Sequence, residues 1–220
     1  MRLPQQVVEV GVLVALAAGL LAAFLGVRAV LVASRRSEGD TADREFVAAR
    51  WPLVRSGASA LVDGDSTPVT VVVFGDYECP FCRLAEPVVE RVSAADSSVH
   101  VAFRHFPLGT HRKAFGAAKA AICAEAQNRF PAMHRQLFSS IRWQLDTNWV
   151  REAAAAGVPD LAEFAACIGS SWPLRRLQHD ISIGRAAGVV GTPAFYFRDW
   201  RYFGPLPEST LTRAARPQRD

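Results

Sequence analysis

Residue types that mark several specialised protein classes are scarce in this chain of 220 residues. Its four cysteines are too few to hold a fold of that length together as a disulfide scaffold. Its two methionines offer little toward the soft ligand set of a copper carrier. Charged residues make up 21% and hydrophobic residues 50%, a balance that excludes extensive disorder. The composition therefore indicates one folded domain with a short additional segment.

Positive charge comes almost entirely from arginine, because Lys113 and Lys119 are the only lysines. The net charge is +4. A basic chain can bind nucleic acid when its basic residues form a patch. Here they are spread along the sequence and interleaved with acidic residues, which is typical of a solvated surface. We therefore expect no nucleic-acid partner.

An unbroken apolar run fills residues 10–27. As a helix it reaches ~27 Å, close to the ~30 Å hydrocarbon core of a bilayer. We therefore predict a single transmembrane anchor within residues 1–36 and a juxtamembrane linker over residues 37–59. A cleaved signal peptide is the alternative, although its apolar region normally has about 7–15 residues. Arg28, Arg35 and Arg36 follow the run, and the positive-inside rule would leave the next domain in the cytoplasm.

The chain beyond residue 60 has the pattern of an α/β domain. Residues 69–74 are almost wholly apolar and β-branched, which is typical of a buried central strand. A helix is predicted from residue 80 to about residue 92, and an alternating pattern predicts a second strand over residues 99–106. Together these segments form a βαβ unit.

The second half of the chain is mostly helical in pattern. Residues 107–187 are rich in alanine and predict a block of helices. Residues 194–197 and 201–203 then predict a hairpin, and a last helix starts near residue 207. The predicted order is therefore βαβ, a helical block, then ββα.

The motif Cys79-Pro80-Phe81-Cys82 directly follows the first predicted strand. Proline is favoured at the first helical position, which places Cys79 at the helix cap. Free backbone N–H groups and the helix dipole there favour a thiolate, so the pKa of Cys79 should fall below the free value of ~8.5. Cys82 lies one turn further on, where it can reach Cys79 but is better shielded. We predict that Cys79 is the attacking sulfur and Cys82 the resolving one.

Metal binding is the main alternative use of such a cysteine pair. Structural zinc takes four ligands, commonly from two pairs, whereas Cys123 and Cys167 stand far apart in the sequence and no histidine pair has ligand spacing. We therefore expect no metal, and dithiol redox chemistry is favoured. Thr192-Pro193 could be an ordinary loop breaker or a cis peptide that presents a backbone edge beside the cysteines.

The runs F-G-D-Y-E-C-P-F-C and G-V-V-G-T-P-A-F-Y-F, with the helical block between them, resemble the DsbA-like branch of the thioredoxin superfamily over residues 60–215. The resemblance implies a thioredoxin fold with a helical insertion at about residues 107–187. It implies that Cys79 is the nucleophile, that Cys82 resolves, that Pro193 is cis and that Thr192 shapes substrate contact. It implies no cofactor, and an extracytoplasmic enzyme that a quinone-linked membrane partner reoxidises.

The favoured function is a dithiol oxidase that introduces disulfides into exported proteins with reduced cysteines. We expect it in the cell membrane as a single-pass protein, with its catalytic domain outside the cytoplasm, because the cytosol would hold an oxidising dithiol reduced. A disulfide isomerase or reductase is the enzymatic alternative. A metal- or partner-binding thioredoxin-like module is the alternative without enzymatic activity.

One position departs from the family pattern. Many relatives carry a buried acid six residues before the first cysteine, where this chain has Val73. Asp76 and Glu78 lie nearby in the turn, and either these acids or water would have to carry the proton of the resolving thiol. His105 and His111 flank the turn after the second strand. Either could contact the thiolate, but we expect them to serve as local caps and packing groups.

Cys123 and Cys167 are predicted to form a second, structural disulfide. Gly116 and Ala120 share the helical face of Cys123, so another helix can approach closely there. Some DsbA-like relatives place a cysteine pair in comparable helices. The alternative is two unpaired, buried cysteines that act as small hydrophobic residues.

Overall fold

The computed structural model describes residues 5–61, 70–96 and 98–215. The chain divides into two compact units, Met1–Glu45 and Phe46–Asp220. The second unit carries both cysteine pairs. Each unit is described by itself below.

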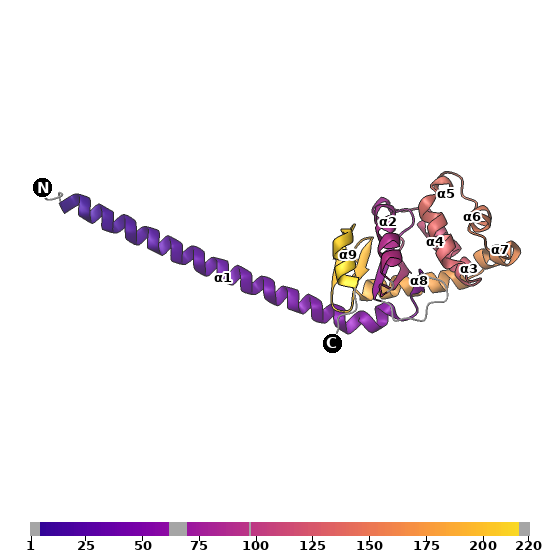
Figure 1. Cartoon of the computed structure of the whole chain (residues 1–220), viewed down its shortest axis with the longest axis horizontal. Coiled ribbons are helices and arrows are strands. Elements are labelled where there is room, and N and C mark those ends of the chain that lie inside the picture. Colours follow the sequence, from indigo (N-terminus) through magenta and orange to yellow (C-terminus); the bar gives the residue numbers. More distant parts are fainter. Residues whose placement is uncertain (1–4, 62–69, 97, 216–220) are drawn as a thin grey trace. The chain divides into compact units, whose positions relative to one another are not determined.

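Helix α1 (Gln5–Arg55) covers most of the segment that we predicted as a juxtamembrane linker, residues 37–59 (Figure 1). A helix can continue through these residues, because polar composition alone does not end a helix and no proline interrupts the sequence between Pro4 and Pro52. Most side chains of the predicted anchor lie outside the described residues. Among the residues that are described, no helix combines the length and the apolar character needed to cross a membrane.

The second unit is built on a five-stranded sheet with the order β1-β3-β2-β4-β5. The strands β2 and β3 are parallel, and the other neighbours are antiparallel. The strands are β1 (Ser59–Ala60), β2 (Val71–Gly75), β3 (Val101–His105), β4 (Ala194–Tyr196) and β5 (Arg201–Phe203).

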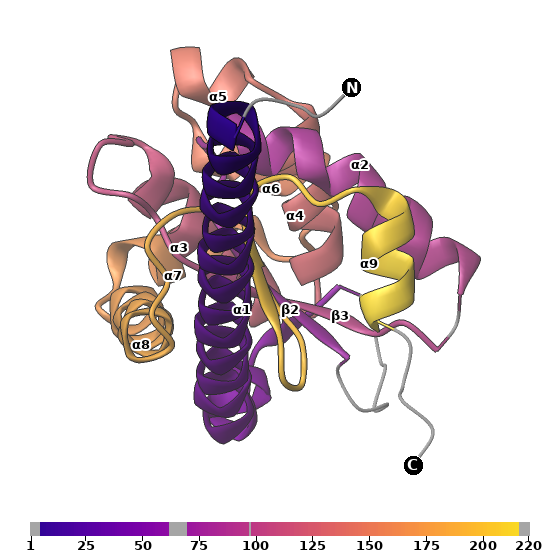
Figure 2. The ribbon, with the colours of Figure 1, turned by 90° about the vertical axis from the view of Figure 1, so that its left-hand side faces the viewer.

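The two faces of the central strand β2 bury different helices, since successive side chains of a strand point to opposite faces. Val71 and Val73 pack in the cluster that includes α2 (Pro80–Ala95) and α9 (Glu208–Ala215). Val72 and Phe74 pack in the cluster that includes α8 (Trp172–Ala186) and the end of α1. Figure 2 shows α2 and α9 on one side of the strands and α8 on the other.

Five helices form an insertion between β3 and α8, and they pack mainly on one another. They are α3 (Ala114–Glu125), α4 (Phe130–Ser139), α5 (Arg142–Leu145), α6 (Trp149–Ala155) and α7 (Leu161–Gly169). Helix α8 joins the insertion to the sheet, because Leu177 packs against α3 whereas Ile183 and Ala187 pack in the core of the sheet. A Cβ on Gly116 would lie 2.6 Å from the ring of Trp149, so glycine is what allows α3 and α6 to approach so closely. The whole is a thioredoxin fold with a helical insertion.

Candidate active site

Cys79 caps the amino terminus of α2, and Pro80 occupies the first turn, as the sequence predicts. The central strand β2 leads directly into this turn. It ends at Gly75, where an added Cβ would lie 2.4 Å from the ring of Phe103 on β3. The close strand packing at Gly75 therefore fixes where the cysteine turn begins.

Cys79 and Cys82 are both free thiols in the structure, and both are buried, with exposed fractions of 3% and 4%. Residue exposure alone does not separate the two cysteines, but burial is the largest influence on the pKa of Cys82, as expected for the better shielded sulfur. The two sulfurs also differ in their hydrogen bonds. As a thiol, Cys79 donates to the carbonyl of Thr192 across 3.3 Å, whereas Cys82 Sγ accepts from the backbone N–H of Asp76 at 3.5 Å.

Opposite pKa shifts separate the two thiols. The hydrogen bond from Cys82 lowers the pKa of Cys79 most; burial opposes it, and the backbone N–H groups of Cys82 and Phe81 add to the lowering, which brings this pKa to about 5. Burial raises the pKa of Cys82 far above its ordinary value, and the negative charge on Cys79 raises it further. At neutral pH the reduced site therefore holds one thiolate, on Cys79, and one thiol, on Cys82.

The peptide bond between Thr192 and Pro193 is cis, and this loop lies against the cysteines. The carbonyl of Thr192 contacts Cys79 Sγ although 113 residues separate them in the chain. The sequence left open whether this loop is an ordinary breaker, and the structure brings it directly against the cysteines.

Asp76 takes part in the site although the family pattern has its acid elsewhere. Val73 is a core residue of the sheet. The side chain of Asp76 is fully buried, and its Oδ2 lies 2.6 Å from His111 Nδ1. From the sequence we favoured a local cap or packing role for His111 over contact with the thiolate, because nothing in the pattern reveals its contact with Asp76 across 35 residues of chain.

A second buried polar chain adjoins the cysteine turn. The hydroxyl of Tyr77 lies 3.0 Å from His134 Nδ1, and His134 Nε2 lies 2.9 Å from a carboxylate oxygen of Glu86. His105 is also fully buried, and burial lowers its pKa to about 3, so its ring is neutral. The sequence did not predict the Tyr77–His134–Glu86 chain, because its members come from three separate elements.

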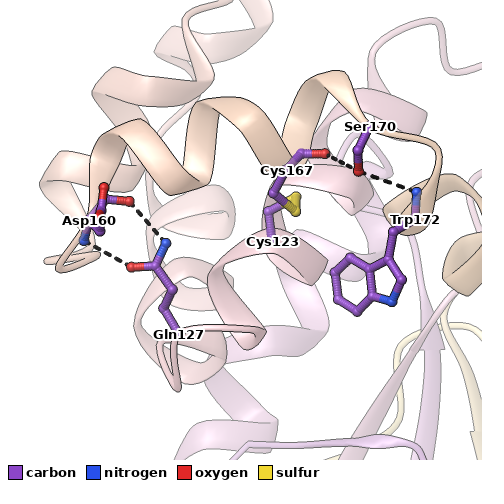
Figure 3. The surroundings of a disulfide bond; sticks show 6 residues. All are labelled: Cys123, Gln127, Asp160, Cys167, Ser170 and Trp172. Carbon is purple, nitrogen blue, oxygen red and sulfur yellow. Dashed lines mark hydrogen bonds between the residues drawn. A yellow bond between two sulfur atoms is a disulfide. The ribbon is translucent and has the colours of Figure 1, made fainter.

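Cys123 and Cys167 form a disulfide that joins α3 to α7, with their Cα atoms 5.9 Å apart (Figure 3). The predicted pairing is thus present in the structure. Gln127 adds two hydrogen bonds between the same helices, one to the backbone N–H and one to the carbonyl of Asp160, each 2.9 Å long. Within the described ranges, no cluster of three or more histidine, cysteine or acidic side chains is placed to hold a metal ion.

A cysteine pair at the start of the helix after the central strand, beside a cis-proline loop, is the arrangement of the thioredoxin-fold thiol–disulfide oxidoreductases. A family model described as Thioredoxin matches residues 60–215, and the chain belongs to this family. Its fold is shared by solved proteins that include two named DsbA2.

Two solved structures illustrate the likeness. The thiol-disulfide exchange protein alpha-DsbA2 from Wolbachia pipientis superposes with a TM-score of 0.68 at 18% identity, over 81% of this chain and 96% of that one. A thioredoxin-like oxidoreductase from Silicibacter pomeroyi DSS-3 superposes with a TM-score of 0.63 at 26% identity, over 72% of this chain and 90% of that one.

Curated relatives are longer proteins that are named as ion antiporters. The Na(+)/H(+) antiporter NhaA 1 of Mycolicibacterium gilvum (strain PYR-GCK) is 36% identical over 155 residues, which are 67% of this chain and 24% of that protein. The chain thus spans about a quarter of the length of the curated relatives that it matches.

Proposed function

We propose that this protein is a membrane-tethered dithiol oxidase that transfers the Cys79–Cys82 disulfide to exported proteins with reduced cysteines. The observation that carries the proposal is the lowered pKa of Cys79. A stabilised thiolate favours the reduced form of the protein, which makes its disulfide a stronger oxidant. Each unit of pKa is about 1.4 kcal/mol, or about 30 mV for this two-electron couple.

The transfer begins when a substrate thiolate attacks Cys79 Sγ and the bond to Cys82 breaks. The leaving sulfur of Cys82 takes a proton, because its pKa is raised. A second substrate thiolate then attacks the substrate's own sulfur in the mixed disulfide and releases Cys79 as a thiolate. Two electrons pass from substrate to protein, one substrate proton ends on Cys82, and the other goes to solvent.

Exposed apolar side chains next to the site support a polypeptide substrate. Phe81 stands between the two cysteines and is 55% exposed, and Leu84 follows it on α2 at 66%. Val190, two residues before Thr192, is 84% exposed. Such side chains suit contact with the apolar segments of a partly unfolded protein, whose cysteines are still accessible.

Two features support a membrane-tethered protein in an oxidising compartment. The apolar run at residues 10–27 is long enough to span a bilayer, and the curated relatives are named as ion antiporters, which work in membranes. The second disulfide, between Cys123 and Cys167, is typical of proteins outside the cytosol. A quinone-linked membrane oxidase is the proposed partner that reoxidises Cys79 and Cys82.

The reduction potential of the full chain, equilibrated with glutathione, tests this function. We expect a value well above that of thioredoxin, ~−270 mV. A value near that figure would show a reductase instead. Zinc that stays bound and blocks alkylation of Cys79 would show a metal-binding module and contradict redox function altogether.

A further inference from the structure

Asp76 connects the cysteine turn to the loop after β3 through its side chain. Its Oδ1 accepts the backbone N–H of Glu78 at 2.8 Å, and its Oδ2 accepts the backbone N–H of Leu108 at 2.8 Å. The same Oδ2 lies 2.6 Å from His111 Nδ1. The carboxylate therefore holds His111 in a fixed position relative to the turn that carries Cys79.

The backbone of Asp76 holds the two cysteines themselves. Its carbonyl accepts the N–H of Cys79 at 3.1 Å, and its N–H donates to Cys82 Sγ at 3.5 Å. One residue thus fixes the distance between the imidazole of His111 and the redox sulfurs. A carboxylate with no exposed surface also needs a positive partner, and a protonated His111 supplies one.

The charged groups around His111 favour its protonated form. The negative charges of Asp76 and Glu78 in the turn and of Cys79 at the start of α2 act on His111, and Arg112 and Lys113 follow it on its own loop. Partial burial works against the charge, but the hydrogen bond and charge of Asp76, with the charges of Cys79 and Glu78, outweigh burial and raise the pKa of His111.

We propose that His111, held by Asp76, is a positioning residue of the redox site whose imidazolium stabilises the Cys79 thiolate and shifts the couple toward its reduced form. The proposal deepens the proposed function and rests on Cys79 and Cys82 cycling between dithiol and disulfide. Reduction of the disulfide takes up two electrons from substrate thiolates and one proton on Cys82. Cys79 remains a thiolate, and His111 keeps its proton throughout.

The test compares His111→Gln, which removes the charge, with His111→Lys, which keeps a cation at the same position. His179→Gln is the matched control, because His179 is an exposed histidine on α8. For each full-length variant, two quantities are measured across pH: the equilibrium constant with glutathione and the thiolate absorbance of Cys79. Circular dichroism verifies that each variant is folded.

We expect His111→Gln to raise the pKa of Cys79. At acidic to neutral pH it should also shift the equilibrium constant with glutathione about threefold to tenfold toward the oxidised protein, which makes the protein a weaker oxidant. The difference from wild type should vanish at alkaline pH, where His111 itself loses its proton. His111→Lys should bring the equilibrium constant with glutathione most of the way back to the wild-type value, and His179→Gln should leave it unchanged.

Two results would overturn the proposal. One is a constant for His111→Gln that equals wild type at every pH. The other is an equal loss in His111→Gln and His111→Lys, which would show a structural role without charge. The absolute potential of wild type, by contrast, decides between oxidase and reductase, so the two proposals can fail separately.

Discussion

At the scale of single residues, the cysteines show how chemistry can differ where burial does not. Cys79 and Cys82 are both nearly inaccessible to solvent. Cys79 accepts hydrogen bonds that favour its thiolate, whereas a negative charge on Cys82 would be repelled by the Cys79 thiolate. The sequence predicts that the pKa of Cys79 is lowered, because a position at the start of a helix is enough to favour the thiolate. It does not predict that Cys82 itself is the main donor to Cys79.

The stability of the reduced protein should depend on the ionisation of Cys79. Its folded pKa, about 5, lies below its ordinary value of 9.0, so its contribution is complete above about pH 9 and is lost as pH falls toward 5. The free energy of unfolding of wild type, relative to that of Cys79→Ser, should therefore rise by about 2 to 4 kcal/mol between about pH 5 and pH 8. Denaturant unfolding of both reduced proteins at several pH values measures the gain, and a constant difference would contradict it.

The roles of the two sulfurs predict different products for their serine variants. Cys79→Ser should abolish oxidation of a reduced substrate, because the reactive sulfur is gone. Cys82→Ser should instead accumulate mixed disulfides with substrate, because attack continues while resolution stops. Non-reducing electrophoresis separates these outcomes. If Cys82 reacts with iodoacetamide at neutral pH much faster than Cys79, the roles are reversed.

At the scale of elements, the sequence predicted most of this fold because each long element has its own local signal. The strand, cysteine turn and helix from β2 to α2 follow from a β-branched run and a proline at the first helical position. The predicted ends differ from the observed ones by a few residues. The strand β1 and the helix α5 were missed, because two and four residues are too few to show a period.

The contacts that the sequence could not predict are those that depend on tertiary structure. Asp76 and His111 meet only because β2 and β3 are parallel neighbours whose ends lie at the same edge of the sheet. Tyr77 and His134 meet only because the helical insertion folds back over the cysteine turn. No residue in these pairs has a local pattern that distinguishes it from a packing group.

The end of α1 is part of the folded second unit. Val47 and Val54 are fully buried, and the fully buried Arg104 donates to the carbonyls of Leu53, Val54 and Ser56. Its guanidinium also pairs with Asp180 on α8. Removing the end of α1 would therefore uncover apolar side chains and leave donors of a buried cation without partners.

Two truncated chains test this dependence. A chain that begins at residue 46 should unfold at nearly the denaturant concentration of the full chain. A chain that begins at residue 58 should have a free energy of unfolding lower by more than about 4 kcal/mol, or should fail to fold. Burial of Val47 and Val54 contributes about 1.5–3 kcal/mol each, and the hydrogen bonds of Arg104 add more. Equal stability of the two chains would show that the end of α1 is dispensable.

The disulfide between Cys123 and Cys167 should stabilise the helical insertion. It closes a loop with a sequence separation of 44, for which chain entropy predicts about 4 kcal/mol as an upper figure. The hydrogen bonds between Gln127 and Asp160 keep the same helices together without it, so we expect the double variant Cys123→Ser/Cys167→Ser to lose about 2–3 kcal/mol. Denaturant unfolding with Cys79 and Cys82 oxidised in both proteins measures the loss, and an unchanged midpoint would contradict it.

At the scale of the whole molecule, charge and redox chemistry predict opposite locations for the catalytic domain. Arg28, Arg35 and Arg36 follow the apolar run, and the positive-inside rule would keep the chain beyond them in the cytoplasm. The cytosol would hold both cysteine pairs reduced, whereas an oxidase needs its Cys79–Cys82 disulfide. We give more weight to the redox argument, because the site is specialised for it and a few arginines are a weak signal.

A membrane-impermeant thiol reagent decides between the two locations. Applied to intact cells after mild reduction, it should label Cys79 in wild type, because the Cys79 thiolate reacts readily at neutral pH. Cys79→Ser is the control that assigns the label, and Cys123 and Cys167 should stay unlabelled while their disulfide persists. Labelling that appears only after lysis would place the domain in the cytoplasm. The oxidase proposal would then fail, since no oxidising compartment would supply its disulfide.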